Sequence, residues 1–301
     1  MTKKALVLGG GGPVGIAWES GLLTGFAEAG VDLSDADFIL GTSAGSFVGA
    51  QLAMGAAPAS LAAPFLAMDD APRTPRLDAP ARDPARPAPD LTVLMRKMAE
   101  ANAGVRPAQE VRAEIGAWAL ENSPMSEDAF IQSFGRFLAE LPADAWPKKG
   151  YACTAVDAAD GAFRLWDKAS GVGLTRAVAS SCSVPGVYPP ITINGRRYID
   201  GGMRSAVNAD MATGYDLVVV VAIRVATGAG EAAQRMRQSL DAEIQILRDG
   251  GARVELVVPD DASVAAFGPN LMDMRRRRSA AQAGVTQGRT SAEALRSAWN
   301  G

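Results

Sequence analysis

The residues with the clearest chemical potential are Ser43 and the two flanking glycines, Gly41 and Gly45. The apolar run 38–40 precedes them, so we predict a strand, a sharp turn that carries Ser43, and a helix that begins at about Gly45. Such a turn crowds the backbone, and the positions of both glycines therefore need residues without a side chain. The raised hydroxyl and the helix N-terminus suit nucleophilic acyl chemistry, whereas a serine that only caps the helix is the alternative interpretation.

The base that would serve Ser43 is not a histidine, because the sequence contains none. This absence excludes a Ser-His-Asp triad, a Cys-His pair and a histidine-ligated zinc site. Asp200 is our candidate base, since it ends a predicted strand and is followed by Gly201 and Gly202, which leave its carboxylate uncovered. A plain Asp-Gly turn is the alternative for the same residues.

A run of four glycines, Gly9 to Gly12, follows the predicted strand 4–8. Its bare backbone lets N–H groups point into a small volume, which suits a phosphate or the oxyanion of an acyl-transfer intermediate. Gly10, Gly12 and Gly15 also match the dinucleotide pattern GxGxxG, and the ribose-binding acid of that pattern should end the next strand. The candidates for this acid are Asp32, Asp35 and Asp37. The next strand ends instead in the serine turn, so dinucleotide binding through residues 9–15 is kept only as an alternative.

The rest of the chain predicts an α/β fold with three layers, in which helices cover both faces of a mostly parallel central sheet. The β-branched run 217–223 is typical of a buried parallel strand, and 254–258 is predicted as another interior strand. Hairpins are expected around Asp160-Gly161 and Asn194-Gly195. Helices are predicted from Pro13 onward and at 46–54, 173–181, 233–247 and 280–299.

Residues 56–148 are predicted to be a helical and proline-rich insertion within a single domain that spans 1–301. From 69 to 90 the chain holds six prolines, four arginines and five aspartates, a composition that cannot bury a core. We expect an exposed loop here, and a lid over the site is the functional alternative. Helices are predicted at 91–101, 111–120 and 129–141.

Composition sets broad limits on the partners and the location of the protein. The formal net charge of −3 argues against nucleic acid as a partner. No apolar run reaches the roughly 18 residues of a membrane span, and glycines end the N-terminal apolar run too early for a signal peptide, so we predict a soluble cytoplasmic protein. Cys153 and Cys182 have no metal or redox spacing and are interpreted as small buried residues. The run 275–278 consists of arginines that either contact anionic lipid or phosphate or form a solvated helix face.

Three motifs together resemble the patatin-like phospholipase family: the glycine run 9–12, the Gly41–Gly45 turn and Asp200-Gly201-Gly202. The resemblance implies a patatin-like α/β hydrolase fold, no metal or other cofactor, and hydrolysis of lipid acyl esters by a Ser-Asp dyad. Ser43 then corresponds to the nucleophile and Asp200 to the dyad acid.

The resemblance also assigns the oxyanion loop, which corresponds to Gly10, Gly11 and Gly12. The expected substrate is a lipid or small ester, with transient contact with a membrane surface left open. The family's glycine loop commonly carries an arginine where this sequence has Val14, so help from that position with an anionic headgroup or substrate is missing. Val14 and the proline-rich insertion together suggest a further alternative, a catalytically silent relative that binds lipid or a partner protein. The sequence does not indicate the acyl length, the headgroup or the oligomeric state.

Overall fold

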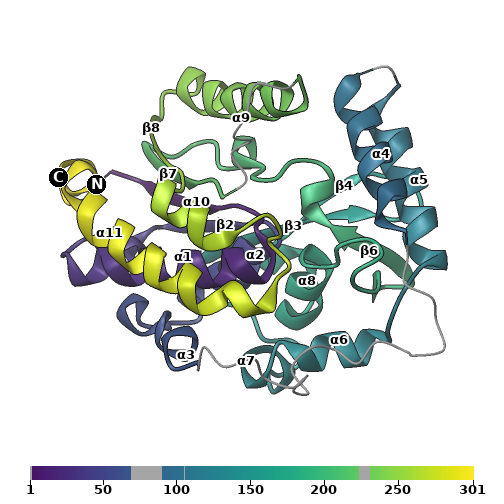
Figure 1. Cartoon of the computed structure of the whole chain (residues 1–301), viewed down its shortest axis with the longest axis horizontal. Helices are drawn as coiled ribbons and strands as arrows, with labels where there is room; N and C mark the ends of the chain where they lie inside the picture. The colour runs from purple at the N-terminus through teal and green to yellow at the C-terminus, as the bar shows by residue number, and fades with distance from the viewer. Residues whose placement is uncertain (1, 69–89, 105, 224–230) are drawn as a thin grey trace.

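The computed structural model describes residues 2–68, 90–104, 106–223 and 231–301 (Figure 1). Within these residues an eight-stranded sheet forms the centre, with strands hydrogen-bonded in the order β5-β6-β3-β2-β1-β7-β8 and with β4 also paired to β3. The strands are β1 (Lys4–Leu8), β2 (Phe38–Gly41), β3 (Gly150–Asp157), β4 (Phe163–Trp166), β5 (Ile191–Ile193), β6 (Arg196–Asp200), β7 (Leu217–Val221) and β8 (Arg253–Val257). The described α-helices are α1 (Gly12–Glu28), α2 (Ala44–Ala53), α3 (Ala63–Leu66), α4 (Leu91–Ala103), α5 (Ala108–Glu121), α6 (Glu127–Ser133), α7 (Arg136–Ala139), α8 (Leu174–Ser181), α9 (Glu231–Asp249), α10 (Asp261–Phe267) and α11 (Arg277–Trp299).

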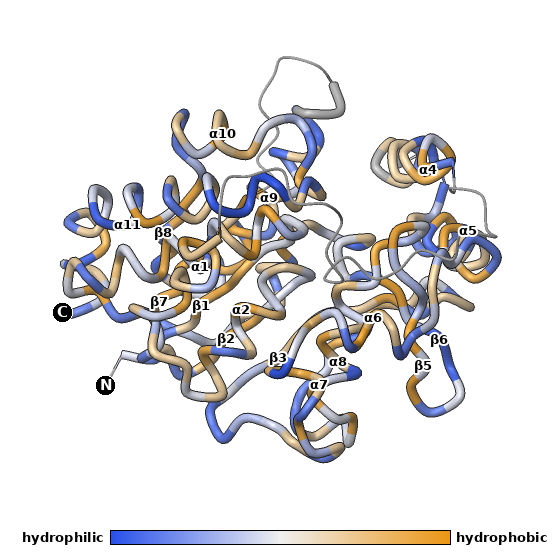
Figure 2. The backbone as a smooth tube through the Cα atoms, turned by 60° about the horizontal axis from the view of Figure 1, so that its bottom comes forward, coloured by the Kyte–Doolittle hydropathy of each residue, from blue (hydrophilic) through white to orange (hydrophobic). Residues whose placement is uncertain are grey.

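The predicted class, a three-layer α/β/α fold with a mostly parallel sheet, is confirmed. Strands β3, β2, β1, β7 and β8 pair in parallel, whereas β4 and β6 pair antiparallel with β3, and β5 pairs antiparallel with β6. Neighbouring strand residues face opposite layers: Leu6 belongs to the core cluster that includes residues of α1, α2, α8 and α11, while Val7 belongs to the cluster that includes Leu247 of α9. Hydrophobic stretches of the backbone accordingly run through the centre of the fold, along β1 and β7 (Figure 2).

Two strands meet end to end along one side of β3. Ala155 of β3 pairs with both β4 and β6, and Cys153 pairs with both β4 and β2. Because a strand residue has only two sides, β2 and β6 must share the side opposite β4. Strand β2 runs parallel to β3 and β6 antiparallel, so their carboxyl ends approach each other at Thr154. We call this point the seam.

Both predicted hairpins are present, and their turns have the expected backbone. Asn194 and Gly195 have φ angles of 50° and 76°, which a tight turn between twisted strands requires. Gly161 also has a positive φ, of 68°. The second hairpin, β5 and β6, delivers Asp200 to the seam.

Two predictions of secondary structure are wrong. Strand β8 is not interior but forms the edge of the sheet, and Leu256 is 41% exposed. The predicted helix 129–141 is two helices, α6 and α7, because Gly135 between them has a φ of +69°. A residue with this positive φ and a ψ of −168° cannot continue an α-helix.

The segment 56–148 lies on the α/β body as separate pieces. Helix α3 packs against α11, α5 against α4, β3 and β6, and α6 and α7 against α8. Figure 1 shows α3, α4 with α5, and α6 with α7 at three positions around the sheet. The proline-rich stretch lies outside the described residues apart from Asp90, whose side chain caps α4. None of the described helices combines the length and the apolar character needed to cross a membrane.

Glu19 of α1 is a carboxyl group buried in the core. Neither of its carboxyl oxygens has a hydrogen-bond partner among the residues that the structure describes. Burial raises the pKa of Glu19 well above the usual 4.5, so the folded protein holds this group in its neutral form at higher pH than the unfolded chain does.

We expect Glu19→Gln to raise the free energy of unfolding at pH 8. This effect should exceed the effect of the same substitution near pH 4.5 by more than about 1 kcal/mol. Well below pH 4.5 the side chain is protonated in the folded and unfolded chains alike. As the pH rises, only the unfolded chain releases the proton, so the wild type loses stability until the raised folded pKa is passed. Urea unfolding of both proteins across this range measures the difference, and a difference independent of pH would contradict the prediction.

Candidate active site

Ser43 occupies a strained turn between β2 and α2. Its φ of 51° and ψ of −115° are unusual for a residue with a side chain. A Cβ atom at Gly41 would lie 2.3 Å from Ser46 Cα, and one at Gly45 would lie 2.1 Å from Leu8 O. The crowding expected from the sequence is therefore present at both flanking glycines.

Ser43 and Asp200 are in direct contact. Ser43 Oγ donates a hydrogen bond of 2.7 Å to Asp200 Oδ2, and the second carboxylate oxygen, Oδ1, accepts the Gly202 N–H at 2.7 Å. The two residues are only 7% and 2% exposed. A buried serine hydroxyl whose partner is a carboxylate can lose its proton to that carboxylate as the oxygen attacks an electrophile.

Thr154 closes the seam between the two strand ends. Its hydroxyl lies 2.9 Å from Thr42 Oγ1, next to Ser43 in the chain. On the other side, a Cβ at Gly201 would lie 2.1 Å from Thr154 Oγ1, so only glycine fits after Asp200. Gly201 thus permits the close approach, while Gly202 supplies an N–H group to the carboxylate.

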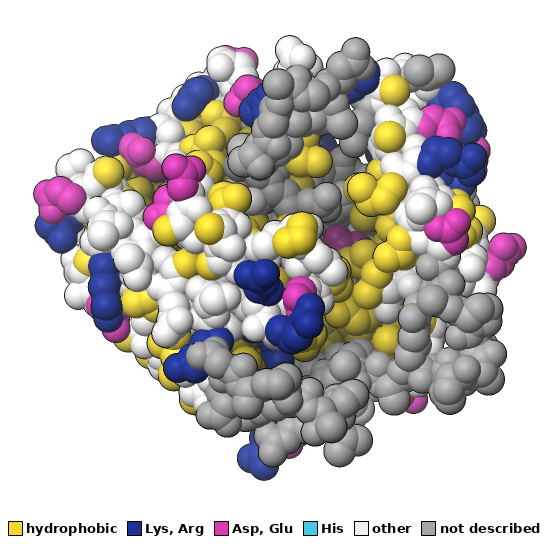
Figure 3. Space-filling view, viewed as in Figure 1, with side chains coloured by type: hydrophobic (Ala, Val, Ile, Leu, Met, Phe, Trp, Pro, Cys, Tyr) yellow, Lys and Arg dark blue, Asp and Glu magenta, His cyan; other side chains and the backbone are white. Residues whose placement is uncertain are grey.

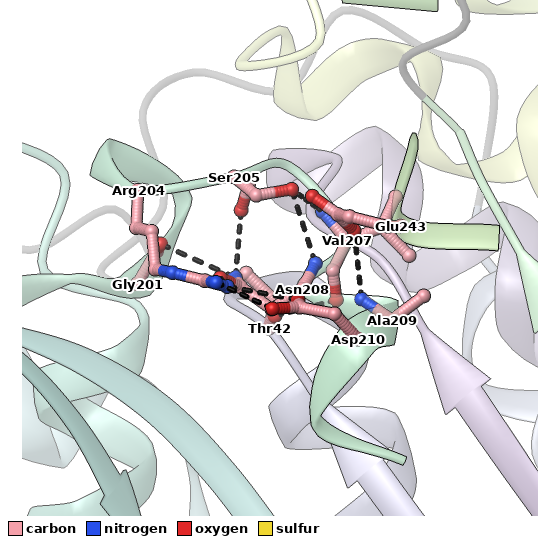
Figure 4. Close-up of polar contacts among 9 residues, drawn as sticks. All are labelled: Thr42, Gly201, Arg204, Ser205, Val207, Asn208, Ala209, Asp210 and Glu243. Atoms are coloured by element: carbon pink, nitrogen blue, oxygen red, sulfur yellow. Dashed lines mark hydrogen bonds and ion pairs between the residues drawn. The ribbon is translucent and has the colours of Figure 1, made fainter. Parts of the chain in front are cut away.

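A polar network contacts the seam through Thr42, and Figure 4 shows Asn208 at the centre of this network. The Asn208 amide donates to Thr42 Oγ1 at 3.1 Å and to Ser205 O at 2.7 Å. Arg204 donates to Asn208 Oδ1 and forms an ion pair with Asp210. These residues were not predicted from the sequence, in which the one signal is an asparagine, a residue that tolerates the left-handed φ of 57° found at Asn208.

The peptide groups of Ser43 are held by the end of α8 and by Ser46 of α2. The Ser43 N–H donates a hydrogen bond to Ser181 Oγ at 3.0 Å. The Ser43 carbonyl oxygen accepts hydrogen bonds from Ser46 Oγ at 2.6 Å and from Cys182 Sγ at 3.1 Å. Burial raises the pKa of the Cys182 thiol, which therefore remains a neutral donor. Cys182 is buried, as predicted, and it also helps to hold the turn.

The glycine loop lies beside Ser43, but its members differ in what their N–H groups do. The Gly10 N–H donates to Ala206 O at 2.7 Å, so it is not available to an oxyanion, contrary to the sequence prediction. No acceptor is recorded in the described part of the chain for the N–H groups of Gly11, Gly12 or Ala44. Ala44 was not among the residues predicted from the sequence, although the residue after the serine of such a turn is a usual donor.

Ser43 lines a cavity of about 320 Å³. The walls are mainly apolar and include Ile16 of α1, Phe47 of α2, Phe65 of α3 and Phe134 after α6. Figure 3 shows hydrophobic side chains around a hollow on this face. The insertion therefore contributes walls to the cavity in the residues that can be described; whether it moves as a lid stays a prediction.

The candidate acids for dinucleotide binding lie away from the glycine loop. The glycine loop follows the carboxyl end of β1, whereas Asp37 precedes β2 and accepts the Lys4 N–H at the amino end of β1. Asp32 is also engaged, as the cap of a short helical turn. Since β1 and β2 are parallel, these acids lie at the opposite edge of the sheet from the glycines.

A family model described as Patatin-like phospholipase matches residues 6–213, more than half of the chain, and these include every predicted site residue. Among solved structures, VipD from Legionella pneumophila is 14% identical with a TM-score of 0.46, and the match covers 97% of this chain and 67% of VipD. The type III effector protein ExoU is 16% identical with a TM-score of 0.39, and this chain, covered over 97%, spans 54% of ExoU. The curated proteins contain no match to this chain.

Proposed function

This chain belongs to the patatin-like phospholipase family, and on that premise we propose that it hydrolyses carboxylic esters of lipids through a Ser43–Asp200 dyad. The observation that carries the proposal is the 2.7 Å hydrogen bond from Ser43 Oγ to Asp200 Oδ2 at the wall of an apolar cavity. The substrate is a lipid or a small ester whose acyl chain occupies that cavity. Cytoplasmic location and contact with a membrane surface stay predictions from the sequence.

In the first half of the reaction, Ser43 Oγ attacks the carbonyl carbon while its proton passes to Asp200 Oδ2. The carbonyl oxygen then carries a negative charge, and the proposed donors to it are the N–H groups of Gly11, Gly12 and Ala44. Donors of this kind contribute roughly 3 to 4 kcal/mol each to the transition state. When the intermediate collapses, the bond to the alcohol oxygen breaks, and Asp200 returns the proton to the leaving alcohol.

In the second half, a water molecule attacks the acyl group on Ser43. Asp200 accepts a proton from the water as the new C–O bond forms. Collapse of this intermediate releases the carboxylic acid and returns a proton to Ser43 Oγ. The carboxylate therefore acts twice, and the geometry that serves the first half serves the second.

A fluorophosphonate probe tests this proposal directly. We expect the folded protein to bind one probe molecule per chain, and its activity toward a short-chain nitrophenyl ester should fall in proportion to the labelled fraction. Mass spectrometry should locate the probe on Ser43. The reason is that only a serine with an adjacent proton acceptor reacts readily with such an electrophile. A heat-denatured sample serves as the control and should remain unlabelled. A folded protein that neither reacts with the probe nor hydrolyses the ester would favour the catalytically silent alternative.

A further inference from the structure

Strand β8 has one side of its backbone open. It is the last strand of the sheet, on the outer side of β7 (Figure 1), and among the described residues it pairs with β7 alone. The Arg253 N–H and the Val257 carbonyl form hydrogen bonds to residues just before and just after β7. Because peptide groups alternate in direction along a strand, those of Val254 and Leu256 point away from the sheet.

The open part of this edge is bounded at both ends. After β8, the outward carbonyl of Val258 accepts a hydrogen bond of 2.7 Å from Gln287 of α11. Before β8, the Ala252 N–H donates to a carbonyl near the end of α9. An added strand would therefore find the Ala252 carbonyl and the peptide groups of Val254 and Leu256.

A groove lies beside this edge, between β8 and α11. It has a volume of about 230 Å³, and its lining includes Leu256 and Val257 of β8 and Ser291 and Leu295 of α11. Leu256 is 41% exposed although it belongs to the apolar stretch that was predicted as an interior strand. Helix α11 thus leaves room along β8 for the side chains of a further strand.

The two charged side chains of β8 lie on the same face of the sheet. Val257 packs against the core cluster that contains α11, and Arg253 and Glu255 share its face because side chains alternate along a strand. Within one chain these two residues form an ion pair, with Arg253 Nη2 2.7 Å from Glu255 Oε1. Opposite charges two residues apart on one face make β8 complementary to an antiparallel copy of itself.

Charge complementarity also selects a register for such a pair. With Val254 on the twofold axis, Arg253 of each copy lies opposite Glu255 of the other, at the pairing where side chains approach most closely. The two Val254 residues exchange N–H···O bonds, and each Leu256 N–H meets the Ala252 carbonyl of the other copy. A register with Glu255 on the axis would bring two glutamates together, which like-charge repulsion disfavours.

We propose that β8 is the docking edge for a second copy of this chain, and that two copies join through antiparallel β8 strands with Val254 on the axis. Each contact is then made twice, as in other isologous interfaces. A single strand pair buries a small area, so the dimer is reversible and depends on concentration. The inference does not depend on the proposed function, because β1 and β7 separate β8 from β2, the strand that leads to Ser43.

The mass in solution tests the dimer. Light scattering after size exclusion should give the mass of two chains at high concentration and of one chain on dilution. Val254→Pro should raise the dissociation constant roughly tenfold or more, because proline removes an outward N–H and leaves the bonds to β7 intact. Arg136→Glu is the control, since Arg136 is exposed on α7, away from β8 in Figure 1, and should dimerise as the wild type does. A wild type with the mass of one chain at every concentration would overturn the inference and leave the edge to an extended segment of another protein.

Two charge variants test the register. Arg253→Glu leaves two acidic side chains on this face of β8, and Glu255→Arg leaves two basic ones, so like charges meet across the axis in either variant. Each variant alone should dimerise with a dissociation constant raised roughly tenfold or more.

An equal mixture of the two variants should recover the dimer, because opposite charges again face each other between the copies. The ion pair within each chain stays broken in the mixture, so recovery can come only from contacts between chains. Circular dichroism checks that each variant is folded. Wild-type dimerisation of either variant alone, or a mixture no more dimeric than its components, would reject the proposed pairing.

Discussion

Ser43→Ala is expected to lower kcat for a short-chain nitrophenyl ester by roughly 10⁴-fold or more. In the proposed mechanism the substitution removes the oxygen that attacks the carbonyl and forms the acyl-enzyme, and it also removes the donor of the hydrogen bond to Asp200 Oδ2. Alanine keeps the small volume of the turn and its backbone contacts with Ser181 and Cys182, so the fold should remain intact. Steady-state kinetics and circular dichroism measure the two properties separately.

Ser60→Ala is the matched control, because Ser60 is an exposed serine on the short helical turn 58–60 and is absent from the cavity lining. It should retain wild-type kinetics. If the Ser43→Ala protein hydrolyses the ester at the wild-type rate, another nucleophile does the chemistry and the dyad assignment fails. A protein that has lost its circular dichroism signal would instead be retested as Ser43→Gly, which relieves the positive φ.

Asp200→Asn is expected to reduce kcat by roughly 10³- to 10⁴-fold, by analogy with the loss of an orienting or accepting carboxylate in other serine hydrolases. Asparagine has nearly the same shape and can still accept the Gly202 N–H through its oxygen. Its amide nitrogen, placed toward Ser43, donates a hydrogen bond and cannot accept a proton. The rate of fluorophosphonate labelling should fall together with kcat, because both depend on the same proton transfer.

Asp249→Asn provides the control, since Asp249 is exposed at the end of α9. The double variant Ser43→Ala, Asp200→Asn gives a further test. Residues that act as one unit show non-additive effects, so the double variant should be no slower than Ser43→Ala alone. Additive losses, with the double variant slower by the product of the two effects, would show that Asp200 acts in some other way.

Most of the secondary structure follows from local patterns in the sequence. The apolar run 4–8 and the β-branched run 217–223 were identified as strands, and both form in the structure at nearly the predicted bounds. The two errors have physical causes that pattern reading does not contain. An edge strand and an interior strand can have similar sequences, as in β8, and one glycine between apolar residues does not show that it adopts a positive φ, as Gly135 does.

The candidate site was predictable where one residue type is required by geometry or chemistry. The glycines around Ser43 follow from crowding, and the absence of histidine favours a carboxylate such as Asp200 as the base. The partners that depend on pairing between distant segments could not be predicted. Thr154 lies in the seam only because β2 and β6 share one side of β3, and Asn208 reaches Thr42 across 166 positions of sequence. Similarly, the Gly10 N–H is occupied because a loop 196 positions later supplies Ala206 O.

The end-to-end meeting of β2 and β6 also bears on when activity can arise during synthesis. Ser43 and Asp200 are 157 positions apart, so a nascent chain that has emerged only as far as β2 lacks the carboxylate that accepts the Ser43 hydrogen bond. Closing so long a loop costs entropy that is recovered only when β3 and β6 pair. Under the proposed mechanism, ester hydrolysis therefore requires the central sheet to be assembled first, and we expect a chain that ends before β6 to be inactive.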